Sequence, residues 1–220
     1  MTNASVTQTQ LGAYQAKLIF MTDPICSWCW GTLPEVNLLR ERFSHQLQFE
    51  LKCAGLQVGS QRPLTEAKRQ ELIDLWAQVA ATTGQNFAFK LPEDKSFIYH
   101  SELACRTLQI ARAYLRREPW DVFEAIQKAF YVNSRNIADL DTLYTFIEPY
   151  GMSYEDFATM LIQDDIVLMT RNEFDWCGER GIQALPTIFL DQGCGPELLC
   201  GGYATAEYLI PDIITRLSSH

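Results

Sequence analysis

The sequence predicts an α/β fold, in which a small sheet domain is split by a large all-helical insertion. A β-α-β pattern opens the chain and an α-β-β-α pattern closes it, whereas the residues between them carry helical periodicity almost throughout. With 220 residues, the chain is long enough to bury a core without disulfide staples. We therefore expect a discontinuous domain formed by 16–61 and 164–220, interrupted by a helical domain at 62–163.

The opening unit combines a short apolar strand, a helix and an alternating strand. Residues 16–21 read as a buried strand, and helical periodicity follows from 26 to 43. Pro34 lies inside that helix and predicts a kink, because it removes one backbone donor and crowds the preceding turn. Residues 47–53 place apolar side chains at every second position, which is typical of a half-buried strand.

The middle of the chain carries helix signals at regular intervals. Helices are predicted at 65–84, 101–115, 119–130 and 139–148 and from 153 onwards, followed by one at 165–180. The sheet then returns with strands at 185–191 and 197–203, the second at an edge, and a final helix from Thr205 to about Leu217.

Composition excludes several classes of partner. The net charge of -9 and the pI near 4.8 disfavour nucleic acid and anionic membranes as main partners. No apolar stretch reaches the length of a bilayer span. The polar N-terminus lacks the basic and apolar regions of a secretory signal, so we expect a cytoplasmic protein whose seven cysteines are mostly reduced.

The segment "DPICSWCWG" places Cys26 and Cys29 where a strand gives way to a helix. Spacing alone is compatible with a redox pair, half of a metal site or chance. A zinc site needs four ligands, and neither the spacing of Cys194 and Cys200 nor that of the three histidines supplies them, so no metal is predicted. At a helix N-terminus, backbone N–H groups and the helix dipole favour the Cys26 thiolate, and Cys29 lies almost one turn further in.

These residues resemble the thioredoxin superfamily, and most closely its DsbA-like branch with the signal-less protein disulfide isomerases. The resemblance rests on the cysteine pair after a strand and on the helical segments "SELACR" (101–106) and "FYVNSRNIADLDTL" (130–143). It also rests on "ALPTIFL", in which Pro186 matches the cis-proline of the family. It covers nearly the whole chain and implies a thioredoxin-like fold with the helical insertion.

The resemblance also implies a substrate site. The Leu185–Pro186 turn is expected beside the cysteine pair, where the Leu185 backbone can pair with an extended substrate segment. Ser27 and Trp28, which separate the cysteines, are expected on the same surface. Because this dipeptide lacks the histidine of oxidising relatives and the proline of reducing ones, the direction of electron flow stays open.

The function expected is thiol–disulfide exchange or disulfide isomerisation through Cys26 and Cys29, with no bound cofactor. Partners are protein or peptide thiols and disulfides, and glutathione as an exchange thiol. One alternative is a glutathione-dependent transferase or isomerase of the kappa-class or hydroxychromene-carboxylate isomerase type. Those relatives carry serine at the position of Cys26, so the cysteine pair argues against this alternative. Another is a non-enzymatic holdase that binds clients on its helical block.

The remaining cysteines and one acidic residue have competing interpretations. Cys53, Cys105 and Cys177 fall on apolar faces and are expected in the core. Cys194 and Cys200 are either a second redox pair or two reduced thiols. Asp23 is either a relay for the proton of Cys29 or a residue that caps the loop before the helix.

Overall fold

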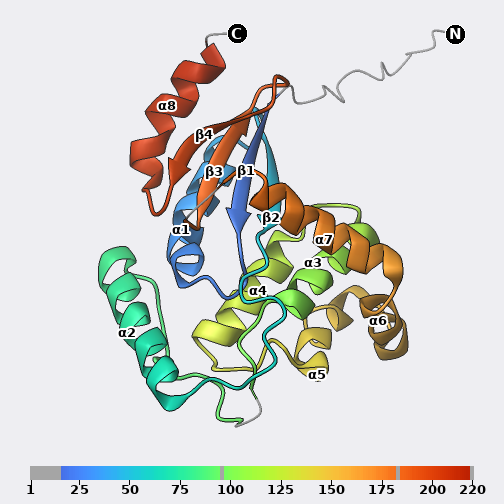
Figure 1. The fold of residues 1–220 in the computed structure, drawn as a ribbon. Coiled ribbons are helices and arrows are strands. Elements are labelled where there is room, and N and C mark those ends of the chain that lie inside the picture. Colours follow the sequence, from blue (N-terminus) through green and yellow to red (C-terminus); the bar gives the residue numbers. More distant parts are fainter. Residues whose placement is uncertain (1–15, 95–96, 182–183, 219–220) are drawn as a thin grey trace, which may run out of the picture.

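One four-stranded sheet forms the centre of the molecule (Figure 1). The computed structural model describes residues 16–94, 97–181 and 184–218, so the polar segment 1–15 lies outside the described residues. Strands β1 (Lys17–Thr22), β2 (Gln48–Cys53), β3 (Thr187–Asp191) and β4 (Pro196–Gly201) are arranged in the order β2-β1-β3-β4. β1 and β2 run parallel, and the other neighbours run antiparallel. The expected α/β class is confirmed.

Eight α-helices are described, and they surround the sheet. They are α1 (Ser27–Arg42), α2 (Glu66–Thr83), α3 (Glu102–Leu115), α4 (Trp120–Tyr131), α5 (Leu140–Tyr144), α6 (Tyr154–Leu161), α7 (Asp164–Gly178) and α8 (Ala206–Ser218). Helices α2 to α6 come between β2 and α7 in the sequence and gather at the end of the sheet where β1 leads into α1 (Figure 1).

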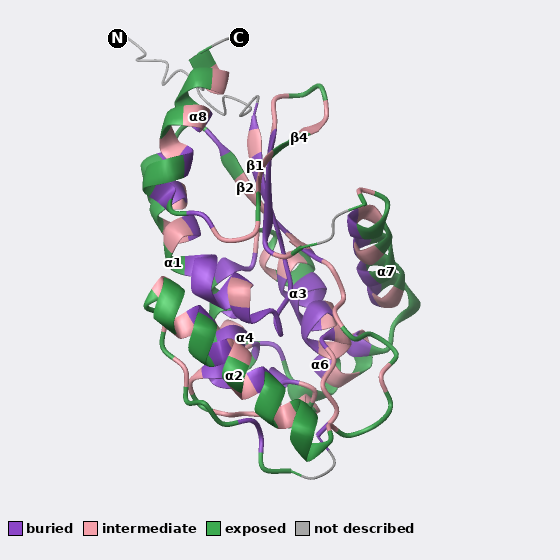
Figure 2. Ribbon diagram, turned by 60° about the vertical axis from the view of Figure 1, so that its left-hand side comes forward, coloured by how far each residue is buried: buried purple, intermediate pink, exposed green. Residues whose placement is uncertain are grey.

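Strand β1 is buried on both faces, which accounts for its continuous apolar sequence. Leu18 and Phe20 belong to the main core, together with residues of α1, α4 and α8. Ile19 and Met21 point to the opposite face, where they form a smaller cluster with side chains of α7 and β3. Figure 2 shows this buried centre between the outer, more exposed helices.

Polar side chains cover the outer edge of β2. Glu118 accepts a hydrogen bond from the Leu51 N–H at 3.1 Å, and Glu173 accepts one from the Cys53 N–H at 2.7 Å. Arg112 donates to the Leu51 carbonyl at 3.0 Å. These bonds occupy backbone groups that an edge strand otherwise leaves open to another chain.

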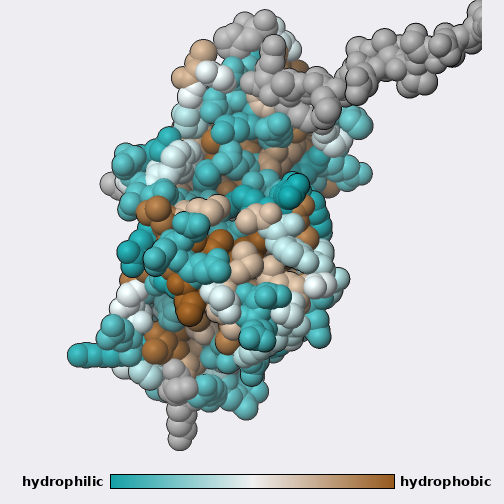
Figure 3. Space-filling view, turned by 90° about the vertical axis from the view of Figure 1, so that its right-hand side faces the viewer, coloured by the Kyte–Doolittle hydropathy of each residue, from teal (hydrophilic) through white to brown (hydrophobic). Residues whose placement is uncertain are grey.

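The surface over α6 and α7 is mixed in character. Figure 3 shows apolar side chains set among hydrophilic ones on this side of the molecule. Ile162 and Leu168 are among the exposed apolar residues.

One helix prediction was wrong in detail. The helix expected at 139–148 ends at Tyr144 and is followed by a 3-10 turn, Glu148–Tyr150, that contains Pro149. Helix α1 agrees with its predicted range and continues through Pro34 as one α-helix. Pro34 cannot donate to the Trp30 carbonyl, but the Gln85 side-chain amide donates to it at 3.1 Å, so this buried acceptor is satisfied.

The predicted starts of α2 at Thr65 and of α8 at Thr205 are confirmed, and both residues cap their helices. The Thr65 hydroxyl accepts from the Lys68 N–H, and Gly84 ends α2 with φ +72°. The Thr205 hydroxyl accepts from the Tyr208 N–H at 3.3 Å.

Helices α1 and α2 lie close together at Gly31. A Cβ at this position would lie 2.8 Å from Val79 Cγ1 and 2.9 Å from Thr83 Cγ2. We expect Gly31→Ala to lower the free energy of unfolding by about 1–3 kcal/mol, because the overpacked helices must separate. Gly178→Ala is the matched control, since it too is a helical glycine but has no atom within 4 Å of the added methyl. Urea denaturation measures both changes, and equal effects would contradict the close contact.

Candidate active site

The cysteine pair lies at the N-terminus of α1. After β1 ends, the Cys26 N–H donates to the Asp23 carbonyl at 3.1 Å, and this turn places Cys26 at the N-cap position. The Cys29 N–H donates to Cys26 Sγ at 3.3 Å. Cys26 is 8% exposed and Cys29 is fully buried, and both are free thiols. The expected proximity of the two cysteines is confirmed.

The two sulfurs differ in their surroundings. Burial raises the pKa of Cys29 well above its ordinary value, and the hydrogen bond and charge of the neighbouring Cys26 raise it further. The Cys26 sulfur accepts a backbone N–H, and Cys26 keeps an exposed fraction of 8%, whereas Cys29 has none. The pair therefore combines one sulfur that a substrate can approach with a second sulfur that burial keeps protonated.

Asp23 joins the loops around the cysteine pair through hydrogen bonds. Its fully buried carboxylate accepts hydrogen bonds from the Ile25 N–H at 3.0 Å, the Leu56 N–H at 2.8 Å and the Ser101 hydroxyl at 2.8 Å. Burial raises its pKa from 3.8 to about 6, although these hydrogen bonds oppose the shift. Of the two sequence interpretations, the contacts favour a residue that fixes the loop before α1.

The Leu185–Pro186 turn lies beside Cys26, although 159 positions separate Cys26 from Leu185 in the sequence. The peptide bond before Pro186 is cis. The Pro186 carbonyl accepts from the Gly202 N–H at 2.7 Å, and Leu185 lines a cavity together with Cys26.

Cys26 lines two cavities. The first, here called the proline-side cavity, has a volume of about 370 Å³ and is bounded by Met21, Cys26, Ala54, Leu56, Phe174, Cys177, Gly178, Ala184 and Leu185. The second, here called the α2-side cavity, has a volume of about 360 Å³ and is bounded by Ile25, Cys26, Ser27, Trp28, Leu56, Gln57, Ser60, Leu64, Lys68, Leu72, Leu75 and Tyr99. Four of the six sequence-predicted site residues, Cys26, Ser27, Trp28 and Leu185, therefore line these cavities. Cys29 is buried behind Cys26, and Pro186 follows Leu185 in the chain.

The two residues between the cysteines are less exposed than expected. Ser27 is buried and Trp28 is half-buried, and the Trp28 ring lies 6.4 Å from the ring of Tyr203, centroid to centroid. Tyr203 follows β4, so the end of this edge strand also borders the site.

Sequence reasoning missed Leu56 and Tyr99. Leu56 lines both cavities, and the Tyr99 hydroxyl donates to the Ile25 carbonyl at 2.7 Å. Both residues come from connectors without regular structure, and no motif or periodicity marks them. Their role depends on tertiary contacts with the loop before α1.

Three further cysteines are buried, as expected. Cys53, Cys105 and Cys177 are each at most 3% exposed. A hydrogen bond with Cys105 and burial raise the pKa of Cys53, burial raises that of Cys105 to about 11, and burial also raises that of Cys177. Protonated thiols of this kind are poor nucleophiles. Cys177 lines the proline-side cavity as well, but Cys26 is the one cysteine of the described residues that lines both cavities.

Cys194 and Cys200 do not form a second pair within this fold. Cys194 lies in the turn before β4, and Cys200 lies near the far end of that strand. The stretch from Pro196 to Cys200 alone spans about 13 Å, whereas a disulfide requires Cα atoms within about 7 Å.

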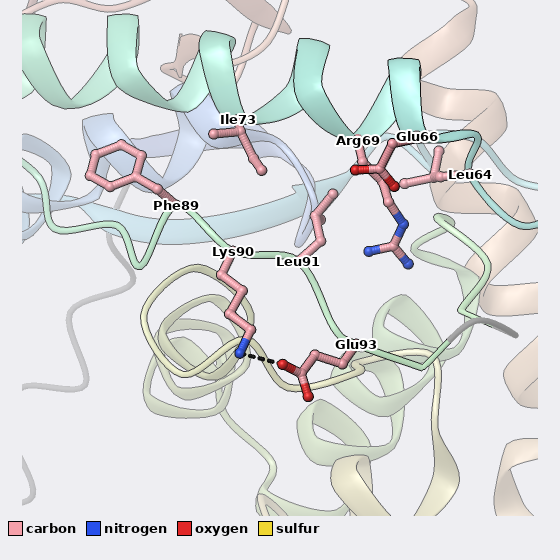
Figure 4. Close-up of a pocket in the computed structure, with 8 residues that line it drawn as sticks. All are labelled: Leu64, Glu66, Arg69, Ile73, Phe89, Lys90, Leu91 and Glu93. Atoms are coloured by element: carbon pink, nitrogen blue, oxygen red, sulfur yellow. Dashed lines mark ion pairs between the residues drawn. The ribbon is translucent and has the colours of Figure 1, made fainter.

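Other features of the described residues do not compete with this site. A cavity of about 510 Å³ lies between α2 and the connector that carries Phe89 to Glu93, but it contains neither Cys26 nor Cys29 (Figure 4). Within the described part of the chain, no group of three or more His, Cys, Asp or Glu residues is placed to hold a metal ion. None of the described helices is long and apolar enough to cross a membrane.

Comparison with known proteins identifies structural relatives. The chain is 30% identical to a candidate protein disulfide isomerase from Nitrosomonas europaea, with a TM-score of 0.84 over 93% of this chain and 98% of the other. It is 21% identical to the cytosolic disulfide reductase DsbM from Pseudomonas aeruginosa, with a TM-score of 0.71 over 93% and 100% of the two chains. DsbM has also been solved with glutathione. No family model and no curated protein matches the chain.

A more distant likeness bears on the isomerase alternative. The chain is 13% identical to 2-hydroxychromene-2-carboxylate isomerase, with a TM-score of 0.61 over 91% of this chain and 95% of the other, which shows a shared fold alone. The relative from Nitrosomonas europaea is close enough to show the family, and the thioredoxin-like fold is confirmed. The chain belongs to the DsbA-like family of thioredoxin-fold disulfide oxidoreductases and protein disulfide isomerases.

Proposed function

We propose that the protein exchanges disulfides with thiols through Cys26 and Cys29. The observation that carries this function is the asymmetry of the pair, in which an accessible Cys26 sulfur accepts the N–H of a fully buried Cys29. The Cys26 thiolate attacks one sulfur of a substrate disulfide, and the other sulfur leaves with the electron pair of the broken bond. This step yields a mixed disulfide and a substrate thiolate.

The second step uses the change in charge at Cys26. While Cys26 is a thiolate, its charge and hydrogen bond hold the proton on Cys29. Once Cys26 is bound in the mixed disulfide, its negative charge is gone and Cys29 ionises more readily. Cys29 passes its proton to the departing thiolate, attacks Cys26 Sγ and releases the rest of the substrate. The Cys26–Cys29 disulfide remains, and the same steps run in reverse when the protein oxidises a dithiol.

The substrate residues next to the attacked sulfur are proposed to bind along the Leu185–Pro186 turn. Support comes from the cavity that Leu185 shares with Cys26. An extended peptide can add to the Leu185 backbone as an extra strand. Ser27 and Trp28 are assigned to the opposite wall, where they line the α2-side cavity.

Glutathione and protein thiols are the proposed exchange partners, and no bound cofactor is needed. The glutathione-containing structure of DsbM supports a tripeptide thiol as a partner. The name of that relative as a cytosolic reductase supports a cytoplasmic location. A glutathione-dependent isomerase is less well supported, because the cysteine pair supplies two sulfurs that such chemistry does not use.

Exchange activity is expected to depend on the two sulfurs in different ways. Cys26→Ser removes the attacking sulfur, so insulin reduction should fall to the uncatalysed rate. Cys29→Ser leaves attack intact but removes the sulfur that breaks the mixed disulfide, so a covalent adduct with the substrate should accumulate. Turbidity and intact-protein mass spectrometry measure the two effects. Wild-type activity in the Cys26→Ser variant would refute the proposed function.

The buried carboxyl group of Asp23 is expected to make the free energy of unfolding depend on pH. Burial raises the folded-state pKa of Asp23 from 3.8 to about 6, so the folded protein binds this proton more tightly than the unfolded chain. The stabilisation from the neutral carboxyl is complete below pH 4 and is lost as the pH rises through 6, a change of about 3 kcal/mol.

Asp23→Asn removes this titration. The free energy of unfolding of the wild type minus that of Asp23→Asn should therefore be about 2 kcal/mol larger at pH 4 than at pH 7, because part of the change has already occurred at pH 4. Ser101→Ala is the control, because it removes one hydrogen bond to Asp23 but keeps the carboxyl. Chemical denaturation across this range measures the difference, and a constant difference would show that Asp23 does not titrate there.

A further inference from the structure

Cys26 and Leu56 form a ridge between the proline-side cavity and the α2-side cavity, because these two residues line both. The outer wall of the first cavity comes from α7, and that of the second comes from α2. Figure 1 shows these two helices on opposite sides of the molecule. A substrate above Cys26 therefore has a separate cavity available on each side.

The two cavities differ in chemistry. Among the described residues that line the proline-side cavity, none has a charged, amide or hydroxyl side chain. The α2-side cavity also has apolar walls, but it adds the polar residues Ser27, Gln57, Ser60, Lys68 and Tyr99 to its lining. The first cavity therefore offers side chains suited only to apolar groups of a polypeptide, whereas the second also offers donors for a ligand with acceptor oxygens.

The geometry of a disulfide matches a ridge with two sides. The C–S–S–C dihedral of an unstrained disulfide is near 90°, so the two halves of the molecule leave the sulfur–sulfur axis in different directions. When Cys26 attacks from the ridge, one half can enter each cavity. Two equal cavities would favour a symmetric disulfide, whereas unequal cavities favour two unlike halves.

We propose that the preferred substrate is a mixed disulfide between a polypeptide cysteine and a small polar thiol of the glutathione type. This inference rests on the proposed function and specifies its substrate class. The polypeptide half occupies the proline-side cavity, next to Leu185, and the small thiol occupies the α2-side cavity, next to Lys68.

Lys68 supplies the charge that recognises the small thiol. Its ammonium group lies 2.6 Å from Glu71, and both side chains are more than half exposed. An exposed pair of this kind contributes little stability, so Lys68 can turn from Glu71 to a carboxylate of the ligand at small cost. Glutathione carries two carboxylates and two amides, which match the lysine, hydroxyl and amide groups of the α2-side cavity.

The reaction balances with one external reductant. The Cys26 thiolate attacks the polypeptide sulfur, and the small thiol leaves with the electron pair. Cys29 transfers its proton to that thiolate, attacks Cys26 Sγ and releases the polypeptide thiolate, which takes a proton from water. Two molecules of a low-mass thiol then reduce the Cys26–Cys29 disulfide and become a low-mass disulfide.

The test compares three substrates that share their parts. They are a one-cysteine peptide joined to glutathione, the same peptide as its own symmetric disulfide, and glutathione disulfide. Dithiothreitol recycles the enzyme, and chromatography follows the released thiols. We expect kcat/KM for the mixed disulfide to exceed that of either symmetric disulfide by about tenfold, since only the mixed substrate fills both cavities with matching groups.

A charge-removing variant tests which cavity holds the small thiol. Lys68→Gln should raise KM about threefold to tenfold for the two glutathione-containing substrates and leave the symmetric peptide disulfide unchanged. Lys90→Gln is the matched control (Figure 4), because Lys90 pairs with Glu93 at 2.6 Å with the same sequence spacing but lies outside both cavities. This control should leave all three values of KM unchanged.

Two outcomes overturn the inference. Equal kcat/KM for the three substrates would show that the cavities do not select unlike halves. An equal effect of Lys68→Gln on all three would show that Lys68 does not recognise the small thiol. In either case the proposed function stands if Cys26→Ser remains inactive on insulin, so the two failures are distinguishable.

Discussion

The buried carboxylate of Asp23 is the contact on which the arrangement of the site depends. It binds the loop before Cys26 through Ile25, the connector after β2 through Leu56, and the start of α3 through Ser101. These segments are far apart in the sequence, and each needs a buried acceptor for its donor. Because one carboxylate satisfies all three, the position of Cys26 relative to Leu56 is fixed by the same group that joins the sheet to the helices.

Burial also selects which sulfur reacts. Five of the seven cysteines are buried, yet Cys26 alone among these five combines a backbone donor to its sulfur with a place in both cavities. Thiols without these features stay protonated or enclosed, and exchange requires a thiolate that the substrate can reach. The abundance of cysteine in this chain is therefore compatible with a single reactive pair.

The sequence predicts features that depend on neighbouring residues. It does not predict features that depend on a contact with a segment far away in the chain. The strands, the caps at Thr65 and Gly84 and the position of Cys26 before a helix follow from neighbouring residues. The donor that satisfies the Trp30 carbonyl beside Pro34 does not, because Gln85 supplies it from just beyond the end of α2. Leu56 and Tyr99 escaped prediction for the same reason, since isolated connector residues acquire a role only through the loop that they contact.

One wall of the site comes from the helices between β2 and α7, and not from the sheet. The end of β1 and the N-terminus of α1 position the two sulfurs. They do not supply the outer wall of the α2-side cavity, which Trp28 also lines. Helix α2 provides that wall, and its close approach to α1 requires the absence of a side chain at Gly31. The glycine near the cysteine pair thus sets how near α2 comes to the reactive sulfur. Substrate selection and helix packing are consequently linked, because any residue that moves α2 away from α1 also widens the cavity beside Cys26.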